Sequence, residues 1–189
     1  NKLAKVISEA GQRSISFPSS LDFISARTEF YERPTALPVV ERSGIKLDLH
    51  RRDFTINTMA IRLDARHFGE LIDSWGGYAD VQHKIIRVLH SLSFIDDPTR
   101  MLRAVRFEHR FKFTIENRTL ELMSEAVGQL KAITGERIRH ELDLLFAEED
   151  PAGILNRLQD LDLLAHIQPG LTWDKNKAAA LTHLLNTSL

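Results

Sequence analysis

The sequence predicts an α+β protein in which a first half with short strands precedes a helical second half. Up to about residue 89, short alternating or apolar runs are separated by glycine, proline and serine, which is the pattern of strands and turns. Beyond that point turn residues become rare and apolar residues recur at helical spacing. We therefore place a boundary at residues 90–95 and predict two domains, residues 1–92 and residues 93–189.

Composition narrows the class of protein. The chain has 189 residues, of which 43% are apolar and 27% charged, as in ordinary soluble globular proteins. It has no cysteine, which excludes disulfides, cysteine-based zinc sites and thiol nucleophiles and is typical of a reducing cytoplasm. No apolar run has the length of a membrane span and no signal peptide opens the chain, so we expect a cytoplasmic protein that does not bind membranes.

Charge is distributed unevenly although the net charge is only −1. Residues 100–118 contain six Lys or Arg against two acids, whereas residues 141–162 contain seven acids against one arginine. This pattern predicts a polarised surface that attracts an anionic substrate to the basic segment and repels it from the acidic one.

The first residues suggest a helix end followed by a hairpin. Helical spacing up to Gly11 indicates the end of a helix, and alternation at Ser14–Phe17 and again at residues 21–25 indicates two short strands. Asp22 would point away from its apolar neighbours, as a surface aspartate or as part of a site. From Ala26 to Pro38 the prolines favour an irregular connection.

The central stretch, residues 51–60, reads RRDFTINTMA and follows a helix predicted at residues 45–50. Its arginines can grip phosphate, and Asp53 can accept hydrogen bonds from sugar hydroxyls. If the run is helical, Asn57 shares the face of Asp53. The alternative is a helix with an Arg–Asp ion pair and a capping asparagine.

Three further elements complete the first half. Strands are predicted at residues 60–63 and 85–89. The glycine pair Gly76-Gly77 predicts a tight turn or hinge, with Asp80 as the capping residue of a following helix.

The second half opens with a helix predicted at residues 98–111. Its arginines Arg100, Arg103, Arg106 and Arg110 lie on one arc with few acids to pair them, which suits phosphate ligands; the alternative is a solvated basic face. An apolar stripe within residues 120–130 predicts core, and residues 154–167 predict one further amphipathic helix. Asp160 and Asp162 in that helix form a D-x-D sequence without the strand or turn of a metal site.

Four motifs carry a resemblance to a known family: RRDFTIN, then WGGYADVQHKIIRVL, then DDPTR followed by LRAVRF, and last GERIRHEL. In this order, over residues 21–145, they resemble the class II nucleotidyltransferases, the tRNA CCA-adding enzymes and bacterial poly(A) polymerases. The resemblance implies a partial polymerase-β-like nucleotidyltransferase head with a short sheet, followed by a helical neck and body. It implies an enzyme that adds AMP, or AMP and CMP, to RNA 3′ ends, with ATP, CTP and a tRNA 3′ end as partners.

The resemblance also implies roles for individual residues. Asp97 and Arg100 would read the Watson–Crick edge of the incoming base, although Asp97 is equally suited to capping its helix, and Asp96 stands where the family has glutamate. Glu136 and Arg137 would brace this helix. The remaining candidates are Arg52, Asp53 and Asn57 for ribose and phosphate, Arg103 and Arg106 for triphosphate or the RNA end, and Arg110 and Arg139 for RNA.

Catalysis in this family would use two Mg²⁺ ions. The family's first motif, a GG turn followed by a D-x-D pair, is not found here, and the chain begins at Asn1 rather than at Met. We therefore expect the main metal ligands upstream of Asn1, with Asp22 as an additional catalytic ligand, and expect the chain to be inactive alone. The alternative function is a helical RNA-binding module that has lost catalysis, which predicts no D-x-D upstream.

Overall fold

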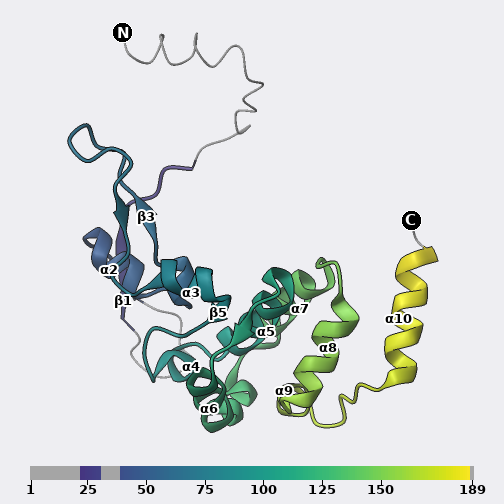
Figure 1. The fold of residues 1–189 in the computed structure, drawn as a ribbon. Coiled ribbons are helices and arrows are strands. Elements are labelled where there is room, and N and C mark those ends of the chain that lie inside the picture. The colour runs from purple at the N-terminus through teal and green to yellow at the C-terminus, as the bar shows by residue number, and fades with distance from the viewer. Residues whose placement is uncertain (1–21, 31–38, 188–189) are drawn as a thin grey trace, which may run out of the picture.

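Figure 1 shows the computed structural model, in which residues 22–30 and 39–187 are described. The predicted helix end before Gly11 and the strand at residues 14–17 lie outside these residues. The first half consists of short elements: β1 (Arg27–Phe30), β2 (Val39–Arg42), α2 (Ile45–His50), the 3-10 turn η1 (Thr55–Asn57), β3 (Ala60–Ile61), β4 (Leu71–Ile72), α3 (Gly77–His83) and β5 (Ile85–Ile86).

The second half is helical, as predicted, apart from one two-residue strand. Its elements are α4 (Ser93–Asp96), α5 (Arg100–Phe111), β6 (Thr114–Ile115), α6 (Asn117–Ala126), the 3-10 helix η2 (Val127–Ala132), α7 (Gly135–Phe146), α8 (Pro151–Asp160), α9 (Leu163–Ile167) and α10 (Lys175–Thr187). Because β6 pairs in parallel with β5, the two halves share a sheet. The α+β fold class is thus confirmed. No helix in the described part of the chain is both long and apolar enough to cross a membrane.

The strand predicted at residues 21–25 is not observed, because residues 22–26 have no regular secondary structure; its predicted partner at residues 14–17 lies outside the described residues. A different pair of strands follows, in which β1 pairs antiparallel with β2, with Arg27 opposite Arg42. The expected irregular connection from Ala26 is therefore wrong at its start. The prolines that suggested it fall between the two strands in the sequence.

The central stretch is not helical. Phe54 is fully buried and forms an isolated antiparallel bridge with Val88, and the N–H of Thr55 donates to the carbonyl oxygen of Arg87 at 3.0 Å. The extended backbone turns Phe54 into the core and leaves Asp53 facing α5, because successive side chains of an extended segment point in opposite directions.

The glycine pair does start a helix, α3. Gly76 has a φ of +75°, and the N–H groups of Gly77 and Tyr78 donate to the Asp73 carboxylate at 2.8 and 2.9 Å. The predicted capping role of Asp80 is wrong, because this residue lies inside α3. It is 5% exposed and accepts a hydrogen bond from Thr55 Oγ1 at 2.6 Å, which ties α3 to η1.

The C-terminal helices include one unexpected break. The single helix predicted for residues 154–167 is two helices, α8 and α9, separated at Asp162, whose φ is +59°. The Asp150 side chain caps α8 by accepting from the N–H of Gly153 at 2.8 Å.

One hydrophobic core crosses the predicted boundary at residues 90–95. Phe54, Ile86 and Val88 from the first half belong to the same buried cluster as the apolar face of α5 and residues of α6 to α9. The stripe predicted within residues 120–130 is confirmed as core. In Figure 1, α5 runs through the middle of the molecule with the short elements on one side and α7 and α8 on the other.

The approach of α3 to η1 requires a glycine at position 77. A Cβ at Gly77 would collide with the Thr55 carbonyl oxygen and lie 3.0 Å from Met59 Cγ. We expect Gly77→Ala to lower the free energy of unfolding by about 1–3 kcal/mol in urea denaturation. Gly128→Ala is the matched control, since no atom lies within 4 Å of its added Cβ. Equal stability of the two variants would contradict the packing seen between α3 and η1.

Candidate functional site

The arginine pair that opens the central stretch is held by one buried carboxylate. Asp48 is 5% exposed and accepts from Arg51 Nη2 at 2.9 Å, from Arg52 Nη2 at 3.2 Å and from the N–H of Arg27 at 3.0 Å. Burial raises the pKa of Asp48, but these donors outweigh it and hold the pKa below its ordinary value. Arg51 also pairs with Glu29 at 2.8 Å. Arg52 is thereby positioned while its side chain stays 42% exposed to a ligand.

Asp53 uses both carboxylate oxygens within the protein. Its Oδ1 accepts from the N–H of Phe54 at 2.9 Å and from Asn57 Nδ2 at 2.8 Å, so the predicted proximity to Asn57 is observed without a helix. Its Oδ2 accepts from Arg103 Nε at 2.9 Å and Nη2 at 2.6 Å. An ionised carboxylate offers about four lone-pair sites. In this conformation, therefore, Asp53 has no site left for a sugar hydroxyl.

The pKa of Asp53 reflects the same contacts. Burial raises it, whereas the charge of Arg103 and the hydrogen bonds from Asn57, Arg103 and the Phe54 N–H lower it, and the net result is a pKa below the ordinary value. Asp53 is therefore ionised at neutral pH.

Asp97 and Arg100 are each bound to the protein through one polar atom and keep a second one without a partner among the described residues. Asp97 Oδ1 accepts from the N–H and Oγ1 of Thr99 at 3.0 and 2.6 Å and from Arg137 Nη2 at 2.6 Å. Arg100 is 6% exposed; its Nη2 donates to the carbonyl oxygen of Arg51 at 2.9 Å, while its buried Nη1 has no hydrogen-bond partner. No hydrogen bond reaches Asp97 Oδ2 within the described part of the chain. The turn-forming role of Asp97 thus occupies only one of its oxygens, and Arg137 braces it as predicted.

These groups meet around one cavity of about 360 Å³. It is lined by Glu29, Arg51, Arg52, Asp53, Asn57, Asp97, Arg100 and Arg103. Its volume is within the range of small-molecule sites, and all of its lining residues are polar or charged. A larger cavity of about 850 Å³ lies at the other end of α5, away from the motif residues apart from Arg110. Six of the seven predicted nucleotide-binding residues therefore converge on the smaller cavity, from the central stretch, the segment between α4 and α5, and α5 itself.

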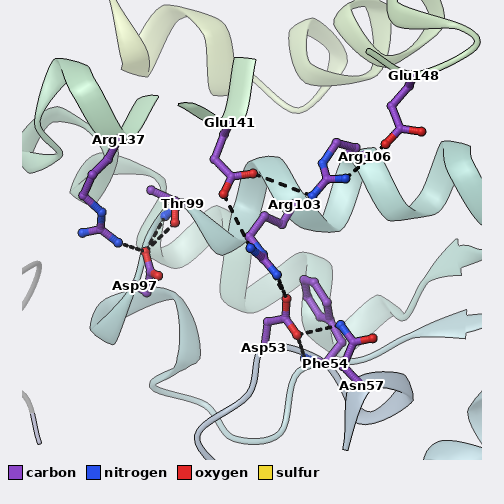
Figure 2. Close-up of polar contacts among 10 residues, drawn as sticks. All are labelled: Asp53, Phe54, Asn57, Asp97, Thr99, Arg103, Arg106, Arg137, Glu141 and Glu148. Atoms are coloured by element: carbon purple, nitrogen blue, oxygen red, sulfur yellow. Dashed lines mark hydrogen bonds and ion pairs between the residues drawn. The ribbon is translucent and has the colours of Figure 1, made fainter. Parts of the chain in front are cut away.

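The expectation that the α5 arginines lack acidic partners is wrong. Arg103 lies 3.7 Å from Glu141, and Arg106 lies 3.1 Å from Glu148 and 4.0 Å from Glu141. Figure 2 shows the resulting row of alternating charges from Asp53 through Arg103, Glu141 and Arg106 to Glu148. The Arg106 side chain is 7% exposed and does not line the smaller cavity. Glu141 lies on α7 and Glu148 in the segment that follows it, and this part of the chain packs against α5.

The other predicted residues lie apart from this cavity. Arg110 is 53% exposed and lies 3.6 Å from Glu148, and Arg139 is 83% exposed and lies 3.8 Å from Asp143. Asp22 is exposed on an irregular segment. In the described ranges, no group of three or more His, Cys, Asp or Glu side chains is arranged to hold a metal ion.

The sequence analysis missed two acids that hold the arginines of the site, Asp48 and Glu141, although the sequence contains a pattern that points to each. Asp48 stands three and four residues before the arginine pair, the spacing at which side chains meet on a helix. Glu141 occupies a position between Ile138 and Leu145 on the apolar stripe of α7 and is 5% exposed. A carboxylate in such a stripe needs a cationic partner from another element.

Comparison with known proteins agrees with this architecture. Residues 3–87 match the family described as “Poly A polymerase head domain”, and residues 112–174 match “Probable RNA and SrmB- binding site of polymerase A”. The chain is 49% identical over 175 residues to the A-adding tRNA nucleotidyltransferase of Geobacter sulfurreducens, covering 90% of the chain and 20% of the relative. It is 44% identical over 168 residues to the protein of the same name from Halalkalibacterium halodurans, covering 87% of the chain and 39% of the relative.

Solved structures are similar over the same region. “The structure of CCA-adding enzyme apo form II” has a TM-score of 0.82 at 45% identity and covers 87% of the chain and 39% of that structure. “Thermotoga maritima CCA-adding enzyme complexed with tRNA_CCA” has a TM-score of 0.71 at 44% identity and covers 80% and 38%. The chain belongs to the family of class II tRNA nucleotidyltransferases and bacterial poly(A) polymerases. It spans less than half the length of these relatives.

The low pKa of Asp53 gives a pH-dependent stability. Because the folded pKa lies below the unfolded one, the contribution of Asp53 is complete above the unfolded pKa and is lost as the pH falls through the folded pKa. We expect Asp53→Asn to cost about 1–3 kcal/mol in urea denaturation at pH 7. The deficit relative to the parent chain should shrink as the pH is lowered toward 3.

Glu141→Gln is the matched control for this experiment. Burial raises the pKa of Glu141 and outweighs the attraction of Arg103 and Arg106, so its ionised form is disfavoured in the folded state. We therefore expect this neutral replacement to leave stability at pH 7 equal or higher. If the loss of stability in Asp53→Asn does not change with pH, the contact between Arg103 and Asp53 does not depend on the charge of Asp53.

Proposed function

We propose that this chain holds and reads the incoming nucleotide in an enzyme that adds AMP, or AMP and CMP, to the 3′ end of RNA, most directly tRNA, with release of pyrophosphate. One observation carries the proposal. Arg100 Nη1 and Asp97 Oδ2, a donor and an acceptor without protein partners among the described residues, belong to two residues that line the same polar cavity. Paired groups of this kind satisfy a base and need no template strand.

The chemistry of this pair fits adenine and cytosine. Both bases carry an exocyclic amine, which can donate to Asp97 Oδ2, and a neighbouring ring nitrogen, which can accept from Arg100 Nη1. Guanine and uracil present carbonyl oxygens where the amines stand, and a carboxylate cannot donate to them. The pair thereby favours two of the four nucleotides.

The remaining wall of the cavity suits the sugar and the phosphates. Arg52 is exposed and Arg103 partly exposed, and guanidinium groups bind phosphate with two parallel hydrogen bonds. Asn57 and Asp53 lie beside them for the ribose. Arg106, which is buried and paired with Glu148, is better explained as a support of α5 than as a triphosphate ligand. Arg110 and Arg139 remain exposed for contacts with RNA.

Enzymes of this family generally use divalent metals, and we propose Mg²⁺ for this one. Bound metal would activate the attacking 3′-oxygen and stabilise the leaving phosphates. The residues described here do not fit two metal ions, because Asp22 is exposed and no cluster of ligands surrounds it. The steps assigned to this chain are therefore binding and orientation. The relatives named for A-adding activity and the solved complexes of CCA-adding enzymes with ATP and with CTP support the same substrates.

Base reading can be tested by nucleotide binding to the chain. We expect Asp97→Ala and Arg100→Ala each to reduce the preference for ATP and CTP over GTP and UTP by about 1–3 kcal/mol, because each removes one partner of the base. Equilibrium competition with a fluorescent ATP analogue measures all four affinities. Arg118→Ala is the control, since this arginine is exposed on α6 and pairs with Glu121 at 2.8 Å. An unchanged preference in both site variants would refute the base-reading role.

We expect this chain to bind RNA but not to extend it. With labelled tRNA lacking its 3′ end, we expect weak binding that falls about tenfold or more between about 50 and 200 mM salt, because phosphate contacts dominate. Arg110→Ala and Arg139→Ala should each reduce the salt slope by about one. With ATP, CTP and Mg²⁺ present we expect no extension of the tRNA. Extension above background would reveal a metal site among residues that the present assignment leaves out.

A further inference from the structure

The ribose side of the cavity is closed by the protein itself. All lone-pair sites of Asp53 are taken, two of them by the bidentate contact from Arg103 Nε and Nη2 to Oδ2. A ribose hydroxyl can donate to Asp53 only if the Arg103 guanidinium leaves Oδ2. The released cation then needs a new anionic partner, because one-third exposure does not fully hydrate it.

We propose that Glu141 is a positioning residue for ribose recognition, which receives Arg103 when a nucleotide binds and so frees Asp53 for the sugar hydroxyl. The proposal rests on the proposed function and adds to it the residue that determines the choice between ribose and deoxyribose. It concerns the described residues alone and needs no bound metal.

Glu141 has accepting capacity that the present conformation leaves unused. Its Oε1 lies 3.7 Å from Arg103 Nη1, too far for a hydrogen bond, and its Oε2 is buried without a hydrogen-bond partner. A buried carboxylate oxygen without a partner is unfavourable. Movement of Arg103 toward Glu141 would give Oε1 a hydrogen bond and stabilise the charge of the carboxylate, whose burial now raises the pKa of Glu141.

Of the two arginines beside Glu141, Arg103 is the one with open space next to it. It lines the cavity shared with Asp53 and also an adjoining cavity of about 320 Å³ lined in part by Glu141. Arg106, on the other side of Glu141, is bound to Glu148 and lies nearer the Phe107 ring, at 4.9 Å against 5.8 Å for Arg103. In Figure 2 the Arg103 side chain lies between Asp53 and Glu141. A guanidinium has five N–H donors, so it can bind Glu141 and a phosphate oxygen together.

The inference predicts coupling between Glu141 and a ribose hydroxyl. Affinities of the whole chain for ATP, 2′-deoxy-ATP and 3′-deoxy-ATP identify the hydroxyl that contributes. We expect Glu141→Gln to reduce the preference for ATP over that deoxy analogue by about fivefold or more, which is within the usual range of coupling between sites. The affinity for the deoxy analogue itself should change little. A purely structural role would weaken ATP and the analogue equally, and that result would overturn the inference.

Two variants complete the test. Glu148→Gln makes the same chemical change at the end of the charge row beside Arg106 and should keep the parent preference. In an Asp53→Asn background, Glu141→Gln should have no further effect on ribose preference, because its route through Asp53 is gone. Circular dichroism and thermal unfolding check the fold, and Glu141→Asp, which withdraws the carboxylate by one methylene, replaces Glu141→Gln if that variant does not fold.

The outcomes separate this inference from the proposed function. A parent chain that binds no ATP overturns both. A parent chain that prefers ATP to a deoxy analogue, with the full preference retained in Glu141→Gln, overturns the role of Glu141 alone. The role of Glu141 is supported if Glu141→Gln loses the preference for ATP and Glu148→Gln keeps it. In the Asp53→Asn background, Glu141→Gln should then have no further effect on this preference.

Discussion

The contact between Asp53 and Arg103 determines how the site is assembled. The two residues are 50 positions apart and join the central stretch, which has only a short 3-10 turn of its own, to the long helix α5. Arg100 makes a second link by donating to the carbonyl oxygen of Arg51. These links and the burial of Phe54 place the central stretch beside α5. The polar cavity lies between the two.

The uneven distribution of charge along the sequence is explained by ion pairs inside the folded chain. The basic segment of α5 and the acidic segment that begins in α7 are brought together by packing, so that Glu141 and Glu148 pair with Arg103, Arg106 and Arg110. The prediction of a surface polarised between the two segments is therefore wrong for these residues. Removal of charges from water is unfavourable unless they are paired, and the alternating row pairs most of its charges while joining α5 to α7, with Glu141 the least satisfied member. Arg52 and Arg110, which lie outside the row, keep more exposed guanidinium groups for ligands.

The sequence predicted what depends on local periodicity and could not predict what depends on packing. The helices around Pro98 and Asp48, the turn at Gly76 and the core stripe of α6 follow from spacing, caps and glycine conformation. The motif residues identified the cavity because the family resemblance grouped them. The partner of Arg106 lies 42 residues away and is fixed by the angle at which helices meet, which no local pattern encodes. The break at Asp162 was missed for a related reason, since a left-handed aspartate is uncommon and does not interrupt apolar spacing.

The three polar groups that face the ligand differ in how far the protein already satisfies them. Asp97 and Arg100 are each held on one side, which fixes their orientation, and each keeps one atom without a protein partner among the described residues. Groups oriented in this way reject a base that cannot pair with them, because the mismatched complex leaves buried donors and acceptors without partners. Asp53 is satisfied on both oxygens, so sugar recognition requires a rearrangement that base recognition does not. For the proposed function, the base-reading side is therefore already oriented, whereas the sugar-binding side must open through the contact between Asp53 and Arg103.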